Sequence, residues 1–432
     1  MRARGADLAT AGAALGLAAL AGLVGGILYL AGRPVHASSA PFTAHWLPHL
    51  GPGTPLAAAI AVLVTWHGPR LAATLPWRRL LGLTYAAAAA WILSLALVDG
   101  WRRGLADRLT TRHEYLSEVG EVTDVPAMLR GFTGRILDFQ PDSWTTHVAG
   151  HPPGALLVFV GLDRIGLGGG GWAALTCVAA GALCAVAVPV TLRALGDEAA
   201  ARAAVPFLVL FPGAVWIGVS ADGLFAGVTA TGLALLAVAA RRNSLVTGLG
   251  AGLLLGGGLF LSYGLTLLAV PALAVVFLAG RLRPVIAALA GATAVVTAFA
   301  LAGFWWLDGY HLVTLRYYQG VASVRPYAYW IWADLALVAV CAGPAAAVIL
   351  RRAAIKRPWR RPAVVLPAAA LLAILAADVS GYSKAEVERI WLPFAVWLLA
   401  GAALIPPAGR RFWLVAQAAV ALLVNHLLLT TW

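Results

Sequence analysis

The stretch DGWRRGLADRLTTRHEYLSEVGEV (residues 99–122), followed further on by DSWTTHVAGHPPG (142–154), is the longest polar interruption in a very apolar chain. Between residues 99 and 154 lie eight of the eighteen acidic residues, which are Asp99, Asp107, Glu114, Glu118, Glu121, Asp124, Asp138 and Asp142. His147, His151 and two consecutive prolines stand at its end. So many carboxylates beside histidines, in a chain otherwise suited to lipid, predict that chemistry takes place in this stretch.

The composition around this stretch is that of a membrane protein. Of the 432 residues, 61% are hydrophobic and only 11% are charged, whereas soluble domains carry about 25% charged residues. The apolar residues fall in blocks of roughly 16–22, the length that crosses a bilayer as a helix. The sequence therefore predicts an all-α, polytopic integral membrane protein with about 13 transmembrane helices in a single membrane-embedded domain, residues 1–432. The expected spans are 11–31, 54–67, 80–98, 172–192, 203–219, 223–240, 245–261, 264–280, 284–304, 328–350, 363–378, 390–405 and 412–430.

The basic residues are distributed unevenly between the loops. The formal net charge is +13, but most Lys and Arg lie in short loops between apolar blocks, as in the segment 351–361. This positive-inside pattern argues against a nucleic-acid partner and predicts a multi-pass protein of the plasma (inner) membrane with a cytoplasmic N-terminus. The polar stretch then lies in the first large extracytoplasmic loop. The segments expected outside are 99–171, 305–327 and 379–389.

The cysteines and the N-terminus indicate neither a metal site nor a cleaved leader. Cys177, Cys184 and Cys341 all lie in apolar blocks, and the sequence has no CxxC pair or Cys/His spacing typical of a zinc site or a disulfide framework. Arg2 and Arg4 precede the first apolar run, which we expect to be a first membrane helix and not a removed signal peptide. No carboxylate spacing demands a metal ion or another cofactor, although the acidic loop is compatible with Mg²⁺ or Mn²⁺.

Two unusual elements are expected around the polar stretch. Residues 103–122 follow a helical period that places Asp107, Glu114, Glu118 and Glu121 on one face, with apolar residues on another. An amphipathic helix lying on the membrane has such faces, although for Glu118 and Glu121 a merely solvated face is the simpler interpretation. Residues 154–166 are too short to cross, so we expect a re-entrant or interfacial helix there.

Five short motifs follow one another in the chain. HEYL (113–116) lies in the polar stretch and His-Pro-Pro-Gly (151–154) closes it, and FPGAVWIGVSADGLF (211–225), GGGLFLSYG (256–264) and SKAEVERIWLPF (383–394) come later. In this order they resemble the C-type (GT-C) membrane glycosyltransferase superfamily, nearest the protein O-mannosyltransferases and the bacterial aminoarabinose lipid A transferases. Three departures stand out. One carboxylate of the family's acidic motif is missing before Glu114, Tyr115 is directly adjacent to the glutamate instead of three places on, and Gly154 stands where the family often has leucine.

The resemblance implies transfer of a sugar from a polyprenyl-phosphate donor to a glycan, lipid or protein acceptor at the outer face of the membrane. A carboxylate then takes the proton of the acceptor, and positive charge holds the leaving phosphate. For the base, the sequence offers Glu114, with Asp107 as the alternative. The expected supporting residues are His151, His147, Tyr115 and Asp222, and the residues expected to meet the donor phosphate are Arg389, Lys384 and Arg325.

Simpler structural roles are open for these side chains: an ion pair of Glu114 with Arg112 or Arg108, a hydrogen-bonded loop histidine at His151, a helix N-cap at Asp222 and a helix-end cation at Arg389 that reaches toward the interface. Two other functions are also open. A transporter or lipid flippase should show inverted repeats and charges near mid-span. A non-catalytic cell-envelope assembly protein does not need acid, histidine and arginine to converge, so a separation of more than about 15 Å between them favours it.

Overall fold

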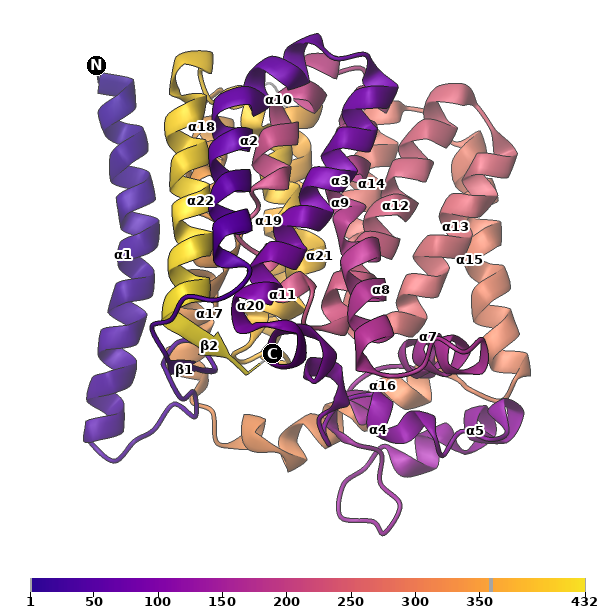
Figure 1. Cartoon of the computed structure of the whole chain (residues 1–432). Coiled ribbons are helices and arrows are strands. Elements are labelled where there is room, and N and C mark those ends of the chain that lie inside the picture. Colours follow the sequence, from indigo (N-terminus) through magenta and orange to yellow (C-terminus); the bar gives the residue numbers. More distant parts are fainter. Residues whose placement is uncertain (1, 357–359, 432) are drawn as a thin grey trace.

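Helices make up most of the computed structural model, which describes residues 2–356 and 360–431 (Figure 1). The longer helices are α1 (Arg2–Leu30), α2 (Thr54–Thr74), α3 (Trp77–Ala96), α8 (Gly170–Ala182), α9 (Cys184–Ala194), α10 (Glu198–Val209), α12 (Ala221–Arg242), α13 (Leu245–Leu261), α14 (Ala269–Ala279), α15 (Arg283–Leu301), α17 (Tyr327–Ala342), α18 (Pro344–Lys356), α19 (Pro362–Ser380) and α22 (Arg410–Leu427). The connecting segments carry α4 (Leu116–Val119), α5 (Val125–Gly131), α6 (Thr146–Ala149), α7 (Pro153–Arg164), α11 (Ala214–Ile217), α16 (Trp306–Gln319), α20 (Val387–Ile390) and α21 (Leu392–Ala395).

The apolar blocks form helices of the length that a membrane requires. In the described part of the chain, seven helices are long and apolar enough to cross a bilayer, or eight if the bent pair α17 and α18, which meet at 104°, is one broken span. Three further apolar helices, Leu245–Leu261, Tyr263–Ala279 and Leu392–Leu404, are shorter. The all-α polytopic class is therefore confirmed, whereas a count of about 13 full spans is not.

Breaks within two expected spans account for part of this difference. The expected span 203–219 is interrupted because α10 ends at Val209 and the short α11 begins only at Ala214. Pro212 and Gly213 lie between them. Proline lacks the N–H that a helix interior needs, and glycine has a low helix propensity. The expected span 390–405 is divided between α20, α21 and a 3-10 segment over Val396–Leu404.

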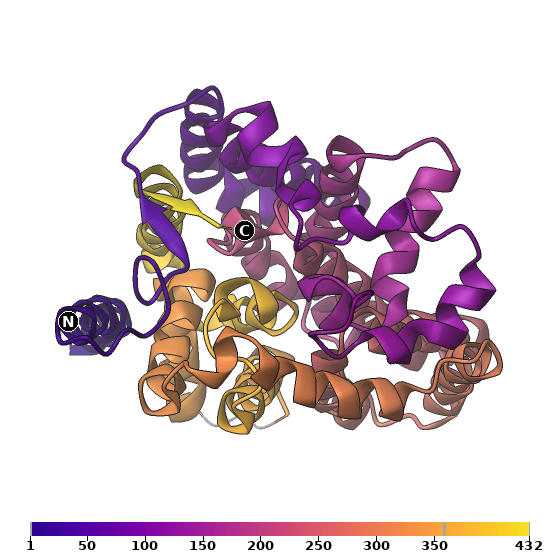
Figure 2. The same ribbon diagram turned by 90° about the horizontal axis from the view of Figure 1, so that it is seen from below.

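The connecting segments gather at the two ends of the helix bundle. In Figure 1 the lower end carries α4, α5, α7, α16 and a small sheet of two strands. These strands, β1 (Ala44–Trp46) and β2 (Leu428–Thr430), are antiparallel, with Ala44 opposite Thr430. Figure 2 looks at this end and shows α1 at the rim of the bundle, where it packs against α17 and α18.

The polar stretch does not form the helix that its periodicity predicts. Residues Arg102–Ala106 form one π-helical turn, Arg108–Thr110 a 3-10 turn and Leu116–Val119 the short α4, so the expected amphipathic helix over 103–122 is wrong. Gly104 shows the cause, because a Cβ there would lie 1.9 Å from the carbonyl oxygen of Ala96 and the chain is folded tightly onto the end of α3. Leu105, Leu109, Tyr115 and Val122 of this stretch are buried in the protein.

Two neighbouring acidic residues of this stretch have different surroundings. Glu118 is buried, accepts a 2.9 Å hydrogen bond from the backbone N–H of Thr145 and lies 3.6 Å from Arg135. The solvated face suggested for it is therefore wrong. Glu121 is 64% exposed and also contacts Arg135, so for this residue the solvated position is confirmed.

The short helix expected over 154–166 is α7, which runs from Pro153 to Arg164. In Figure 1 it lies across the lower end of the bundle. Its first turn passes very close to the end of α13, because a Cβ on Gly154 would lie 2.5 Å from the carbonyl oxygen of Phe260. Position 154 therefore has no room for a side chain.

Candidate active site

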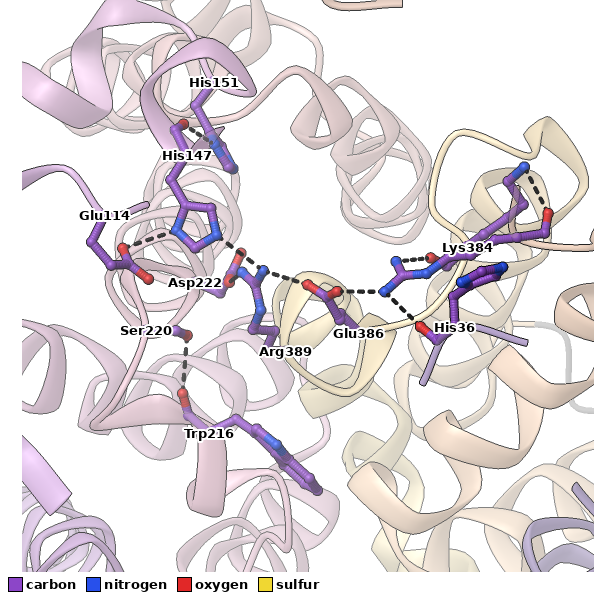
Figure 3. A network of polar contacts seen from close by, with 11 residues as sticks. His36, Glu114, His147, His151, Trp216, Ser220, Asp222, Lys384, Glu386 and Arg389 are labelled. Atoms are coloured by element: carbon purple, nitrogen blue, oxygen red, sulfur yellow. Dashed lines mark hydrogen bonds and ion pairs between the residues drawn. The ribbon is translucent and has the colours of Figure 1, made fainter. Parts of the chain in front are cut away.

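Glu114 and His147 come from the two halves of the polar stretch and meet in the interior. The backbone N–H of His147, in α6, donates a 3.0 Å hydrogen bond to the carbonyl of His113, which brings the two segments together. Nδ1 of His147 lies 2.9 Å from Oε2 of Glu114, and the His147 and Glu114 side chains are only 9% and 3% exposed (Figure 3). A carboxylate buried to this extent is costly unless its partners compensate it.

Arg389 determines which nitrogen of His147 carries the proton. Nη2 of Arg389 lies 3.4 Å from Nε2 of His147, and a guanidinium can only donate hydrogen bonds. Nε2 is therefore an acceptor, so the ring proton is on Nδ1, the nitrogen that lies 2.9 Å from Oε2 of Glu114. His147 thus connects a carboxylate on one side with a guanidinium on the other.

Asp222 lies in the first turn of α12 and binds the same arginine. Its Oδ2 accepts a 2.8 Å hydrogen bond from Nη1 of Arg389, and both side chains are 6% exposed. The N-cap of α12 is Ser220, whose Oγ donates to the carbonyl of Trp216. The alternative role of Asp222 as the N-cap is therefore wrong, although the positive end of the helix dipole favours its charge.

A second carboxylate, Glu386, bridges Arg389 and Arg325. Its Oε2 lies 2.9 Å from Nη2 of Arg389, and its Oε1 lies 2.9 Å from Nη2 of Arg325. Burial alone would raise the pKa of Glu386, but Arg389 and Arg325 outweigh burial and lower this pKa below its ordinary value. Burial likewise works against the charge of Arg389, but Asp222 and Glu386 reverse its effect and raise the pKa of the guanidinium.

The backbone that carries Glu386 is held in an uncommon conformation. Ala385 and Glu386 have φ values of 71° and 63°, in the left-handed region that few non-glycine residues adopt. The N–H of Ala385 donates a 3.1 Å hydrogen bond to Oδ1 of Asp334, and the carbonyl of Lys384 accepts one of 2.8 Å from Nη1 of Arg325. Strained backbone of this kind persists where the surroundings fix it, and it is concentrated at functional sites.

Lys384 lies beside this backbone and is buried. Its Nζ donates to the carbonyl oxygens of Ala322 and Arg325 and lies 5.3 Å from the ring centre of Tyr318. Burial, and to a smaller extent Arg325, lower the pKa of Lys384. Its ammonium group is thus already engaged by protein oxygens.

Tyr115 and His151 enclose the site on the side of α7. The Tyr115 ring is buried and stacks 5.3 Å from Phe159, and the rings of His147 and His151 lie 6.0 and 5.8 Å from it. Nδ1 of His151 donates a 2.8 Å hydrogen bond to the carbonyl of His147. Burial lowers the pKa of His151 to about 4, so its ring is neutral near pH 7 and its Nε2 is a hydrogen-bond acceptor.

The structure brings together most of the residues that the sequence singled out. The members of this cluster are Glu114, Tyr115, His147, His151, Asp222 and Arg389, and Glu386 connects them to Arg325 and Lys384. Glu386 is the residue that the sequence analysis missed. Its signal is an acidic residue one helical turn before Arg389.

Other expected contacts are different in the structure. Asp107, the alternative base, is 52% exposed and pairs with Arg102 at the surface. The expected ion pairs of Glu114 are replaced, because Arg112 donates to His113 and Arg108 lies beside Asp99. Glu114 therefore forms neither of the ion pairs, with Arg112 or with Arg108, that the sequence left open.

The charges of the site are balanced within the protein. The carboxylates are Glu114, Asp222 and Glu386, and the cations are Arg325, Lys384 and Arg389. Over residues 2–356 and 360–431, no group of three or more His, Cys, Asp or Glu side chains is placed to hold a metal ion. Oδ2 of Asp222 and both carboxylate oxygens of Glu386 are bound by arginine.

No family model and no curated protein matches the sequence. Among solved structures, the chain is similar to ArnT from Cupriavidus metallidurans in the apo state, with a TM-score of 0.44 and 18% identity over 75% of this chain and 61% of that chain. It is also similar to the Archaeoglobus fulgidus oligosaccharyltransferase in complex with zinc and sulfate, with a TM-score of 0.41 and 12% identity over 80% of this chain and 51% of that chain. The chain thus spans less than two thirds of either protein.

Proposed function

We propose that the protein is a C-type membrane glycosyltransferase, which moves a sugar from a polyprenyl-phosphate donor to an acceptor at the outer face of the membrane. The observation that carries this proposal is the buried chain of Glu114, His147, Arg389 and Asp222, which draws on segments far apart in the sequence. A scaffold protein has no need of such a chain, because buried charges are costly to desolvate even when they are paired.

Glu114 is the catalytic base in this proposal. Its carboxylate takes the proton of an acceptor hydroxyl while the acceptor oxygen forms a bond to the anomeric carbon of the donor sugar. The bond between that carbon and the phosphate oxygen breaks, and polyprenyl phosphate leaves with the electron pair. The acceptor is a glycan, a lipid or a protein.

His147 is the positioning residue for Glu114. Its Nδ1 lies 2.9 Å from Oε2 of Glu114, and in this proposal the other carboxylate oxygen takes the acceptor proton. Arg389 fixes the tautomer of His147 from the opposite side. A base held in this way loses little freedom at the moment of proton transfer, which is the advantage of a preorganised site.

The donor phosphate meets Arg389, Lys384 and Arg325 in this proposal. Each of the three cations already contacts protein oxygens, and Arg389 binds both Asp222 and Glu386. A phosphate that reaches Arg389 therefore exchanges with one of these carboxylates. A guanidinium suits this exchange because its planar fork can bind two oxygens at once.

The polar end of the bundle faces the outside of the plasma membrane in this proposal, and the N-terminus is cytoplasmic. The three native cysteines are buried, so single introduced cysteines can report the side. We expect Phe139→Cys, at a position that is 82% exposed, to react with an impermeant thiol reagent from outside, and Arg242→Cys at the other end to remain unlabelled. The reverse pattern would exclude the orientation and with it the extracytoplasmic donor.

The function is tested by incubating the purified protein with a panel of polyprenyl-phosphate sugars and candidate acceptors. We expect release of free polyprenyl phosphate with at least one donor, and no release by Glu114→Gln. Glu121→Gln is a matched control, because Glu121 lies in the same loop but is 64% exposed. Movement of intact donor across vesicle membranes, without cleavage in any combination, would instead establish a flippase.

A further inference from the structure

A cavity with two arginines in an otherwise apolar wall lies at the end of the bundle opposite the candidate active site. It has a volume of about 240 Å³ and is formed by the last turns of α2, the first turns of α10 and the start of α22. α2 contributes Pro69, Ala72 and Ala73, and the two charged residues in its wall are Arg202 and Arg410. In Figure 1 this end of α2 and α10 is at the top, whereas α4 and α7 are at the bottom.

Arg202 is held in the cavity wall by contacts that fix its guanidinium. Nη1 donates to the carbonyl oxygens of Ala72 and Leu75 at 2.8 and 3.0 Å, and Nε donates to Glu198 at 3.0 Å. Its Nη2 makes no hydrogen bond to any residue that the structure describes. The guanidinium is thus oriented before a ligand arrives, with one donor group to spare.

Arg410 brings a positive charge that no carboxylate balances within the described residues. Its Nε donates to the carbonyl of Ile405 at 3.2 Å, and neither of its terminal nitrogens has a partner in that part of the chain. Burial lowers the pKa of Arg410, as is expected for a partly buried cation without a counter-charge. An anion in the cavity would remove this cost.

The surface below the cavity is suited to acyl chains. Val62, Trp66, Pro69 and Ala73 share one face of α2, because they are spaced four, three and four residues apart. Val62 and Trp66 are each 62% exposed, while Pro69 and Ala73 line the cavity. An exposed tryptophan near the end of a membrane helix, as at Trp66, is typical of a membrane interface. One helix face therefore leads from the cavity directly onto lipid-facing apolar surface.

We propose that this cavity binds the phosphodiester headgroup of an anionic phospholipid whose acyl chains lie along the exposed face of α2. Arg410 and Nη2 of Arg202 donate to the phosphate oxygens, because guanidinium groups match their geometry. Basic pockets between membrane helices commonly bind anionic lipid headgroups. The apolar face of α2 favours a lipid over inorganic phosphate, which has no part to place there. This site is separate from the proposed active site and does not depend on it.

The test is equilibrium binding of labelled phosphatidylglycerol to the purified full-length protein in neutral detergent micelles. We expect Arg410→Gln to weaken binding roughly fivefold, the usual worth of one basic residue beside an anionic lipid. Ala73→Phe should weaken it by a similar factor, because it fills the cavity and leaves both arginines in place. Arg242→Gln, at an exposed position of the same end, is the matched control and should bind like the parent.

Competition by three unlabelled molecules shows which kind of ligand occupies the cavity. Unlabelled phosphatidylglycerol should displace the label, while phosphatidylcholine and inorganic phosphate should displace little of it. Full displacement by inorganic phosphate would overturn the lipid assignment in favour of a free-anion site, and equal displacement by phosphatidylcholine would overturn the requirement for net negative charge. Parental binding by both Arg410→Gln and Ala73→Phe would exclude the cavity altogether. The thermal unfolding midpoint of each variant shows that it is folded.

Discussion

Two histidine–carboxylate contacts lie at the same end of the molecule and differ in what surrounds them. His147 meets Glu114 at 2.9 Å, with side chains 9% and 3% exposed. His49 meets Asp99 at 3.1 Å, with side chains 14% and 9% exposed. The second ring nitrogen of His147 faces the donor Arg389, whereas that of His49 faces the carbonyl of Leu47 at 2.7 Å.

Because their surroundings differ, the two contacts have different roles. His147 stands between an acceptor and a donor, so a single ring proton is enough to satisfy both sides. His49 stands between two acceptors and can bond both only when both nitrogens are protonated. Its contact holds the segment after β1 against the end of α3, where Arg103 and Arg108 also bind Asp99. The His147–Glu114 contact can hold a reactive carboxylate, whereas the His49–Asp99 contact holds two segments of the chain together.

The largest expected effect is a loss of turnover, which should distinguish Glu114 from Asp99. Glu114→Gln keeps the shape of the side chain but cannot accept a proton at neutral pH, so we expect turnover to fall by about 10²–10⁴. Asp99→Asn should remain within about threefold of the parent rate, because it only fastens the fold. Initial rates at saturating donor, with donor binding measured separately, make the comparison. Similar losses in both variants would show that the two contacts are equivalent.

The arginines of the two regions should differ in what their removal costs in stability. Arg389 is 6% exposed and binds two carboxylates, so Arg389→Ala leaves buried charges unpaired and should cost about 3–5 kcal/mol. Arg103 is 51% exposed, and Arg103→Ala should cost less than about 1 kcal/mol. Unfolding in detergent micelles measures both.

Arg389→Lys refines this comparison. Lysine restores the charge but not the planar fork, so we expect only part of the donor use to return. If Arg389→Ala used donor like the parent, Arg389 would serve the fold alone.

A third comparison lies within the buried region, between two glutamates that are two residues apart. Burial raises the pKa of Glu388 to about 8, whereas Glu386 has a lowered pKa because Arg389 and Arg325 outweigh burial. An ordinary glutamate titrates at 4.5. Between this value and about pH 8 the folded protein keeps a proton on Glu388 that the unfolded chain releases, so Glu388 makes the protein less stable as the pH rises.

We therefore expect Glu388→Gln to stabilise the protein by on the order of 4 kcal/mol at pH 8 and to change little at pH 4.5. Glu386→Gln should destabilise it at neutral pH, because the stability from a lowered carboxyl pKa is present above the unfolded value and is lost in acid. Unfolding midpoints at several pH values test both. If the unfolding midpoints of the parent and of Glu388→Gln changed with pH in the same way, the raised pKa of Glu388 would be contradicted.

The smallest effect is expected at Asp107, the base candidate that the structure places at the surface. Its side chain is 52% exposed and its partner Arg102 is 85% exposed. Asp107→Asn should change stability by less than about 0.5 kcal/mol and leave turnover within roughly twofold. A variant that folds but no longer turns over would return the catalytic role to this residue in place of Glu114.

Much of the site could be predicted because its residues stand in short polar motifs within apolar sequence. A carboxylate such as Glu114, or a cation such as Arg389, is costly next to a membrane unless it has a partner, so its position alone indicates a site. His147 was expected only as a supporting residue, yet it links Glu114 to Arg389. Its sequence neighbours carry no sign of that link, because Arg389 lies far away in the chain.

The parts that could not be predicted depend on contacts between distant segments. The left-handed conformation of Ala385 and Glu386 is held by Asp334 and Arg325. No pattern in the neighbouring sequence predicts this conformation. The helical period over 103–122 is real in the sequence, but close packing of Gly104 on α3 overrides it. Tertiary contacts regularly override local preference in this way.

Gly154 constrains how this chain and its relatives can diverge. Because a Cβ at this position would lie 2.5 Å from the carbonyl oxygen of Phe260, the leucine that often follows the two prolines in C-type glycosyltransferases cannot be gained here by one substitution. The start of α7 and the end of α13 must change together before a larger residue is admitted. Among homologues, we therefore expect position 154 and the residues around 260 to vary as a pair.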